Sequence, residues 1–569
     1  MKQWFFIGLA VVLFGSCRTT KQNGSTFNPY QYSSQKKVVA SNGVVVTAHP
    51  LASAVGIAIM QKGGNAFDAA IATQLALAVV YPNAGNLGGG GFMVAQQANG
   101  NLLALDYREM APAAAHRDMY LNDKGEVDTD KSMNGHLSSG VPGTVAGLFQ
   151  TLPYAKLPMR QLIQPAIELA EKGFAITASE ARALNNIQDE LKKYNTVTPA
   201  FVKATPWQAG DTLVQPHLAA TLKRIQVAGA AGFYEGETAN LIVAEMQRGG
   251  GIISLNDLKG YRAIWRTPHQ FQYKGYSVVS MPPPSSGGLL LHQMLKMVEG
   301  HPLPQWGFLA PQSVQLMVEA ERRAYADRAR YMGDPDFYKV PVTAITSDAY
   351  LKKRMQDFVP GQAGSSQQVQ PGQLSPESEE TTHISIIDAQ GNAVAVTTTL
   401  NNSYGSKTVV GGAGFLLNDE MDDFSAKPGV PNMYGAVGGE ANAIAPGKRM
   451  LSSMTPTLVL KENKPFLVVG TPGGTTIPTS VFQTIVNVID FGMSTEDAVY
   501  KPKFHHQWLP DRIDVEKTFP ADLRQALQNM GYKLNERGAI GRTEVIKVLP
   551  HGRFEGVADT RGDDSAAGF

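Results

Sequence analysis

The sequence contains a single cysteine, Cys17, so no disulfide can form within the chain. Charge is also sparse and balanced, because charged residues make up 17% of the chain, with 50 basic and 49 acidic side chains. That balance creates no whole-protein field that would attract nucleic acid or an anionic membrane. The HExxH motif, cysteine pairs and the GxxxxGK[S/T] phosphate loop are missing as well. We therefore expect no metal and no other cofactor.

Glycine, by contrast, is abundant, and its 57 residues cluster at several places along the chain. Such clusters are typical of tight turns, or of places where the backbone approaches a ligand closely. The clusters are residues 88–91, 249–251, 411–412 and 473–474.

The N-terminus begins like an export signal. Lys2 precedes an apolar run over residues 4–14, which is shorter than the roughly 20 residues that a membrane-spanning helix needs. We predict a signal peptide over residues 1–16. Cys17 follows it directly and resembles a bacterial lipidation site, although Phe14 stands where lipoprotein signals prefer leucine, and an ordinary signal peptide with an incidental cysteine is the alternative. Residues 17–37 are polar and predict a tether. The signal peptide and Cys17 predict a protein in the periplasm or anchored by lipid to the bacterial envelope.

The folded part is predicted to begin at Val38 and to mix helices with strands. The stretch VVASNGVVVTAHP alternates like a strand, and the alanine-rich segment at 65–80 favours a tightly packed helix. Further helical patterns occur at 159–172, 216–229, 237–248 and 311–331, and YSVVSM is strand-like. The pattern is that of a mixed α/β protein.

A sharp change of character occurs at residues 359–380, where Gly, Ser, Gln, Pro and Glu leave almost nothing to bury. The next residues, TTHISIIDAQGNAVAVTTTL, predict two strands joined by a turn, so Thr381 stands where an exposed linker meets a hairpin. On composition alone, a linker between two domains explains this junction better than a cleavage site does.

Thr381 is a candidate nucleophile of a particular kind. The serine-rich segments at 138–147 and 282–288 do not match GxSxG, which argues against a serine hydrolase of that type. A threonine hydroxyl needs a base, and an N-terminal threonine supplies its own α-amine, with a pKa of about 7.7 to 8.0. That amine exists only after the preceding peptide bond is cut, and a linker ending at Thr381 fits this requirement.

Nine segments together resemble the gamma-glutamyltransferases (gamma-glutamyl transpeptidases) of the N-terminal nucleophile superfamily. They cover nearly the whole exported chain, and their order is that of the family. The segments are DYREMAP (106–112), SSGVPGTVAG (138–147), MPPPSSGG (281–288), ETTHISIIDAQGNAVAVTTTLN (380–401), GFLLNDEMDDFS (414–425), KPGVPNMYGAVGG (427–439), LSSMTPT (451–457), GTPGG (470–474) and FHHQWLPD (504–511).

The resemblance implies a four-layer αββα sandwich and a chain that cuts itself between Glu380 and Thr381. Residues 38–380 then form a large subunit and residues 381–569 a small catalytic subunit. Thr399 corresponds to the threonine that hydrogen-bonds the nucleophile, although it is also an ordinary strand former. Gly473 and Gly474 correspond to the oxyanion hole, and their alternative role is a turn at the end of a strand.

The resemblance also implies a pocket for the glutamyl head. Arg108 corresponds to the clamp for the α-carboxylate, where a planar guanidinium donates two parallel hydrogen bonds. Ser452 and Ser453 correspond to hydroxyl donors to the same group. The remaining matches are Asn401, Glu420 and Asp423 for the α-ammonium and Tyr434 in a lid loop. Without the family pattern, DEMDD at 419–423 reads as a solvated acidic turn.

The expected activity is transfer of the gamma-glutamyl group of glutathione and related compounds to Thr381, and then to water, an amino acid or a peptide. A related N-terminal nucleophile amidase is one alternative, of the cephalosporin acylase or poly-gamma-glutamate hydrolase type. A glutaryl chain has no α-ammonium to meet Asp423, and the lid favours small substrates. A surface lipoprotein that binds glutamyl peptides without cutting itself is the alternative outside enzymes.

Overall fold

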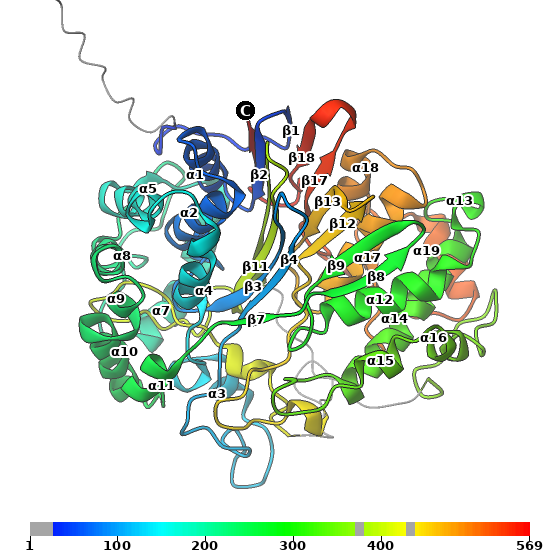
Figure 1. Cartoon of the computed structure of the whole chain (residues 1–569). Helices are drawn as coiled ribbons and strands as arrows, with labels where there is room; N and C mark the ends of the chain where they lie inside the picture. The colour runs from blue at the N-terminus through cyan, green and yellow to red at the C-terminus, as the bar shows by residue number, and fades with distance from the viewer. Residues whose placement is uncertain (1–26, 370–379, 428–438) are drawn as a thin grey trace, which may run out of the picture.

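The computed structural model describes residues 27–369, 380–427 and 439–569, and these form two antiparallel sheets stacked face to face between two layers of helices (Figure 1). The first sheet has the order β19-β2-β10-β11-β3-β4-β7 and the second β1-β18-β17-β13-β12-β9-β8. The predicted αββα sandwich is confirmed. Within the described ranges, no helix has both the length and the apolar character that crossing a membrane requires.

The strands of the first sheet are β19 (Ser565–Gly568), β2 (Gly43–Thr47), β10 (Glu380–Asp388), β11 (Ala393–Asn401), β3 (Gly90–Gln96), β4 (Leu102–Tyr107) and β7 (Ile264–Arg266). Those of the second are β1 (Lys37–Ala40), β18 (Phe554–Val557), β17 (Glu544–Val548), β13 (Lys464–Gly470), β12 (Thr457–Lys461), β9 (Tyr276–Ser280) and β8 (His269–Tyr273). A small third sheet contains β14 (Phe504–His505), β15 (Ile513–Glu516) and β16 (Leu534–Arg537).

One helical layer contains α1 (Pro50–Gln61), α2 (Ala66–Val80), α4 (Thr144–Thr151), α5 (Met159–Lys172), α6 (Ala178–Asn186), α8 (Pro216–Ala228) and α10 (Gly236–Gly249). The other contains α12 (Gly287–Glu299), α14 (Pro311–Tyr331), α17 (Thr476–Ile489), α18 (Thr495–Tyr500) and α19 (Ala521–Asn529). Every residue of α2 is buried, and Asn65 with Asp68 forms a capping box at its start. The helices that the sequence predicts at these places, namely α2, α5, α8, α10 and α14, are confirmed by their bounds.

Side-chain alternation along the central strands assigns each residue to one of two cores. In β11, Val394 and Val396 pack towards α2, whereas Ala393 and Ala395 pack between the two sheets. In β10, Ile384 and Ile386 likewise face the helices. Thr381, His383 and Ser385 therefore share the face of β10 that looks into the space between the sheets.

The start of the folded body differs from the prediction in two ways. The stretch that the sequence presents as one strand is two, because β1 belongs to the second sheet and β2 to the first. The body also begins before Val38, since Tyr32 donates a hydrogen bond to the Ala175 carbonyl at 2.5 Å and Lys36 Nζ donates to three carbonyls, those of Asp559, Gly562 and Asp564. Residues in the second half of the predicted tether are thus bound to the sandwich.

Candidate active site

Thr381 lies at the start of β10, opposite Thr399 of β11. Thr381 is buried, with 4% of its surface exposed, and the strand register shifts between Glu380 and Thr381. A register shift interrupts the regular ladder, so the predicted scissile bond lies at the irregularity. The backbone N–H of Asn401 donates to Thr399 Oγ1 at 2.8 Å, which fixes that hydroxyl on the residue opposite Thr381. The register thus brings together the two threonines that sequence reasoning paired.

His383 supports this face and was not singled out from the sequence. It lies opposite Thr397, with Nδ1 2.9 Å from Thr397 Oγ1 and Nε2 3.1 Å from Ser385 Oγ. Burial lowers the pKa of His383 to about 3, so the ring is neutral at ordinary pH. The signal was present in the sequence, because alternation puts His383 on the same face as Thr381.

Gly473 and Gly474 lie after the end of β13, in the turn that leads into α17. Gly470 of β13 packs directly on the His383 ring, since a Cβ there would lie 2.2 Å from Cε1. This contact brings the end of β13 to the Thr381 face of β10. Gly473 and Gly474 have φ angles of +131° and +53°, which favour glycine at both positions. The turn therefore places two backbone N–H groups near the start of a 14-residue helix, an arrangement suited to an oxyanion.

Arg108 follows β4 and is buried with Glu420 and Asp423. Its Nη1 donates to Glu420 Oε1 and its Nη2 to Asp423 Oδ2, while Nη2 also donates to the Leu451 carbonyl at 3.1 Å. The side chains of Arg108 and Glu420 are each 1% exposed. Sequence reasoning assigned the guanidinium and the carboxylates to different ends of the substrate head, and the structure shows that they also bind each other.

The loop that carries Glu420 and Asp423 is fastened to the end of β11. Asp419 N donates to the Leu400 carbonyl at 3.0 Å, and Asn401 Nδ2 donates to the Asp419 carbonyl at 3.0 Å. Asn401 itself has a φ of +77°, which turns the chain directly after Thr399. These bonds hold the short helix η3 (Glu420–Asp423) next to the two paired threonines. DEMDD is therefore not a solvated turn, because Glu420, Met421 and Asp423 are buried.

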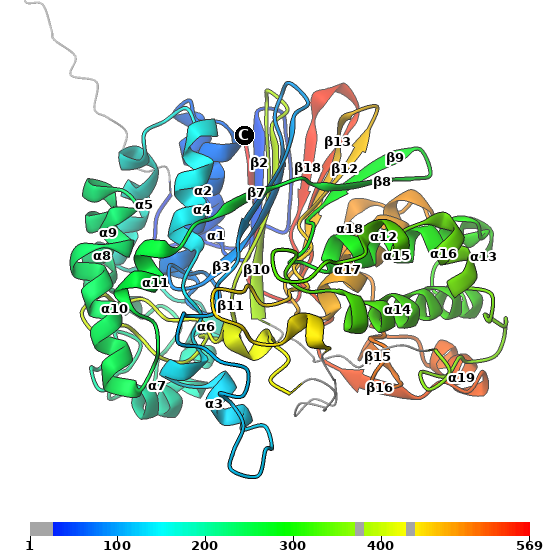
Figure 2. The ribbon, with the colours of Figure 1, turned by 60° about the horizontal axis from the view of Figure 1, so that its bottom comes forward.

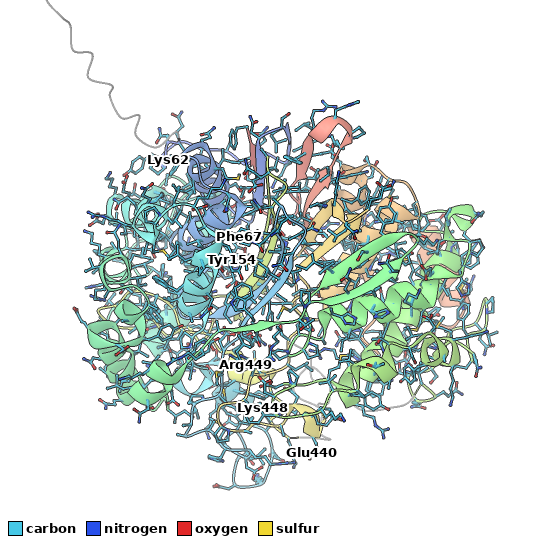
Figure 3. All side chains as sticks on the ribbon, viewed as in Figure 1. Lys62, Phe67, Tyr154, Glu440, Lys448 and Arg449 are labelled. Atoms are coloured by element: carbon cyan, nitrogen blue, oxygen red, sulfur yellow. The ribbon has the colours of Figure 1, made fainter. Side chains whose placement is uncertain are left out.

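Ser452 and Ser453 directly follow Leu451, whose carbonyl accepts from Arg108, in a segment that basic side chains hold in place. Arg449 pairs with Asp106 at 3.3 Å, and Lys448 Nζ donates to the carbonyls of Ala441 and Ala443. Figure 3 labels Lys448 and Arg449, which lie below the two sheets in that view. Within the described part of the chain, the buried Ser453 hydroxyl has no hydrogen-bond partner. A buried hydroxyl of this kind is suited to donate to a ligand.

The MPPPSSGG segment positions these serines. Ser286 Oγ donates to the Ser452 carbonyl at 2.8 Å, and Ser285 Oγ donates to the Met454 carbonyl at 2.6 Å. The serines of this segment are thus structural, as the missing GxSxG pattern indicated.

Glu109 is a further acidic group of the pocket, and sequence reasoning did not select it. Its Oε2 lies 3.7 Å from Arg108 Nη1. Burial raises the pKa of Glu109 to about 7, although the Arg108 charge opposes this shift. The pKa of Glu420 is also raised, chiefly by burial and in part by the charge of Glu109. One guanidinium therefore faces three buried carboxyl groups, and burial favours the binding of a proton within this group.

This proton predicts pH-dependent binding of ligands that carry an ammonium group. Such a ligand favours the charged carboxylates, so binding should weaken as pH falls through about 7, and free glutamate should inhibit less well. Glu109→Gln removes the like charge beside Glu420, which lowers the pKa of Glu420 and moves the weakening to lower pH. The inhibition constant of glutamate, measured from about pH 6 to about pH 9 for both proteins, tests this. An unchanged midpoint in the variant would exclude Glu109 from the coupled group.

Three groups of predicted residues cannot be placed. Tyr434 lies outside the described residues, as do the predicted signal peptide and Cys17. The Glu380 backbone begins β10. The other predicted residues converge on the end of the sandwich at which β10 begins and β11 ends.

The fold and the site together define a class. A threonine at the start of a central strand, in an αββα sandwich and after a linker, is the arrangement of the N-terminal nucleophile hydrolases.

Comparisons with known proteins narrow that class. A family model described as Gamma-glutamyltranspeptidase matches residues 52–569. The chain is 46% identical to the glutathione hydrolase proenzyme of Escherichia coli (strain K12), over 99% of this chain and 98% of that protein. The chain belongs to the gamma-glutamyltranspeptidase family.

Two solved structures agree with this assignment. The cephalosporin acylase from Bacillus halodurans has a TM-score of 0.83 at 28% identity, covering 96% of this chain and 99% of its own. The gamma-glutamyltranspeptidase of Helicobacter pylori has a TM-score of 0.56 at 45% identity, covering 57% of this chain and 94% of its own.

Proposed function

We propose that this chain is an autoprocessed gamma-glutamyltransferase that hydrolyses glutathione and related gamma-glutamyl amides. The observation that carries the proposal is the end of β11, where Thr399 faces Thr381 and the next loop presents Glu420 and Asp423 to the buried Arg108. A gamma-glutamyl head carries a carboxylate and an ammonium on one carbon. A fixed cation beside fixed anions, close to a hydroxyl, matches that head.

Processing begins when Thr381 Oγ adds to the Glu380 carbonyl carbon. The peptide C–N bond breaks as the Thr381 nitrogen takes the hydroxyl proton, which leaves an ester and a free α-amine. Water then hydrolyses the ester and gives two fragments, residues 38–380 with any N-terminal extension and residues 381–569. The fragments stay together as a heterodimer because β10 pairs with β2 and β11 with β3 across the cut. The Helicobacter pylori chain spans a share of this sequence close to that of residues 38–380, which supports the proposal.

Turnover uses the amine that processing creates. The α-amine of Thr381, with an ordinary pKa of about 7.7 to 8.0, takes the hydroxyl proton as Oγ attacks the gamma-amide carbon. The N–H groups of Gly473 and Gly474 stabilise the negative oxygen, and the leaving amine departs with the proton. Water, an amino acid or a peptide then attacks the ester and releases the glutamyl group.

Recognition of the head divides between the two sides of the pocket. Arg108, Ser452 and Ser453 receive the α-carboxylate, whereas Asn401, Glu420 and Asp423 receive the α-ammonium. The substrate charges replace the ion pairs that Arg108 makes with Glu420 and Asp423, so the net affinity is a difference between two sets of contacts. In this proposal Tyr434 belongs to the lid loop of the pocket.

The two alternatives, a related acylase and a non-catalytic binding lipoprotein, make different predictions for simple substrates. Gamma-glutamyl anilide and glutaryl anilide differ only in the α-ammonium, which Glu420 and Asp423 are placed to bind. We expect kcat/KM for the glutaryl compound to be lower by about 100-fold or more, because a buried polar group is left without its partner. Equal turnover would favour an acylase, and a chain that stays whole and turns over neither compound would favour a binding lipoprotein.

Export belongs to the same proposal. The pattern of residues 1–16 and the position of Cys17 support a periplasmic or envelope-anchored enzyme with a lipid at Cys17. The mass of the N-terminal peptide of the large fragment tests this, since cleavage before Cys17 and acylation both change it.

A further inference from the structure

A large cavity of about 720 Å³ adjoins the candidate active site on the side of Gly473. The loop after β11 contributes Ser403 and Tyr404, and α17 contributes Thr476. Much of the remaining wall comes from α6 and from the segments around β15 and β16, which lie on either side of the lower ends of β10 and β11 (Figure 2). The end of α2 and the turn after it, residues 80–83, also contribute. This volume is in the range of small-molecule sites.

The cavity is separate from the pocket for the glutamyl head. Neither Arg108 nor Glu420, Asp423, Ser452 or Ser453 lines it. Gly473 does, and Ser403 is only two residues beyond Asn401. An amide substrate has an acyl side and an amine side, which extend in different directions from the carbonyl carbon. Since the Arg108 pocket takes the acyl side, the cavity beyond Gly473 is placed to take the amine side.

The basic part of the cavity wall consists of Arg512, Arg537 and Arg542. The side chains of Arg537 and Arg542 are 18% and 20% exposed, so both are only partly in contact with solvent. Arg542 Nη2 donates to the Tyr81 hydroxyl at 2.7 Å, and Arg537 Nη1 lies 3.8 Å from Asp514 Oδ2. These contacts hold the guanidinium groups in place, which reduces the entropy lost when they bind a carboxylate.

Three acidic side chains also line the cavity. Asp514 pairs with Arg537, and the other two are Glu180 of α6 and Asp563. Thr177 joins the latter two, since its N–H donates to Glu180 Oε2 and its hydroxyl donates to Asp563 Oδ2, both at 2.7 Å. The wall thus offers fixed charges of both signs. A ligand with an ammonium at one end and a carboxylate at the other, such as an amino acid or short peptide, fits a wall of this kind better than a lipid or a sugar does.

We propose that this cavity binds the amine-side part of the reactants, and that Arg537 and Arg542 bind the free carboxylate of the leaving peptide and of the peptide acceptor. The inference rests on the proposed gamma-glutamyl transfer and adds a second recognition site to it. Both occupants share one chemistry, a short peptide with a free C-terminal carboxylate, and they occupy the cavity in turn.

The test compares two acceptors, glycylglycine and its C-terminal amide, with gamma-glutamyl anilide as a donor whose leaving group has no carboxylate. For Arg537→Gln we expect the KM of glycylglycine to rise about tenfold, as for the loss of one charge-assisted contact. The KM of the amide and the hydrolysis of the anilide should stay within about twofold of the wild type. Arg542→Gln, tested separately, should show the same pattern.

Arg182→Gln is the matched control, because Arg182 is an exposed arginine on α6 that does not line the cavity. Equal shifts for both acceptors in the Arg537 and Arg542 variants, or none for either, would overturn the proposal. If the proposed gamma-glutamyl transfer were itself wrong, the result would be different, because the wild type would then not cleave gamma-glutamyl anilide at all.

Discussion

Replacing Thr381 by alanine is expected to leave one uncut chain, of 61.2 kDa less any signal peptide removed on export, with no measurable turnover of gamma-glutamyl compounds. In the proposed mechanism this hydroxyl opens the Glu380 peptide bond, so the variant never acquires the α-amine that serves as the base. Loss of a nucleophile that acts together with its base lowers kcat by several orders of magnitude. Gel electrophoresis and N-terminal sequencing measure the first effect, and anilide hydrolysis measures the second.

Thr382→Ala is the matched control for this experiment. Thr382 is the next residue in β10 and is also buried, but alternation turns it towards the helices together with Ile384 and Ile386. We expect this variant to be cut and active, and the small fragment of the wild type to begin with Thr381. A wild-type chain that stays continuous yet releases glutamate at full rate would contradict the mechanism.

Local patterns made most of the fold predictable. The hairpin formed by β10 and β11 has alternating apolar residues and a turn, and α5 and α14 have helical periodicity, so both signals lie within one short segment. The division of VVASNGVVVTAHP between two sheets was not predictable, because both halves have the same composition. Pairing of β1 with β18 and of β2 with β10 and β19 decides it.

The pocket was predictable only as a set of residues. Arg108 and Glu420 are 312 positions apart, and no sequence spacing indicates that they form an ion pair. Glu109 was missed because its raised pKa arises from burial, which depends on tertiary packing. The cavity beyond Gly473 was missed for the same reason, since its wall combines α6, β16 and the loop after β11.

The second prediction with a large effect concerns Arg108, for which the structure favours lysine over alanine as the test substitution. Arg108→Ala leaves Glu420 and Asp423 buried without their cation, which costs about 3–5 kcal/mol of stability and confuses any loss of binding with unfolding. Arg108→Lys keeps the charge but removes the planar pair of donors. We expect kcat/KM for glutathione to fall roughly 30- to 150-fold in this variant, equivalent to about 2–3 kcal/mol.

A substrate without the α-carboxylate separates recognition from general damage. The 4-aminobutyryl anilide keeps the amine and the scissile bond, so its slow turnover should be nearly equal in the wild type and in Arg108→Lys. Self-cleavage should also proceed in the variant, because Thr381 and Thr399 are paired through the β10 and β11 ladder and not through Arg108. If Arg108→Lys lowered kcat/KM by the same factor for 4-aminobutyryl anilide and for gamma-glutamyl anilide, Arg108 would only support the fold. The α-carboxylate would then have to bind elsewhere. A loss confined to substrates with the carboxylate would show that the guanidinium, although it pairs with Glu420 and Asp423, exchanges these partners for the substrate during each turnover.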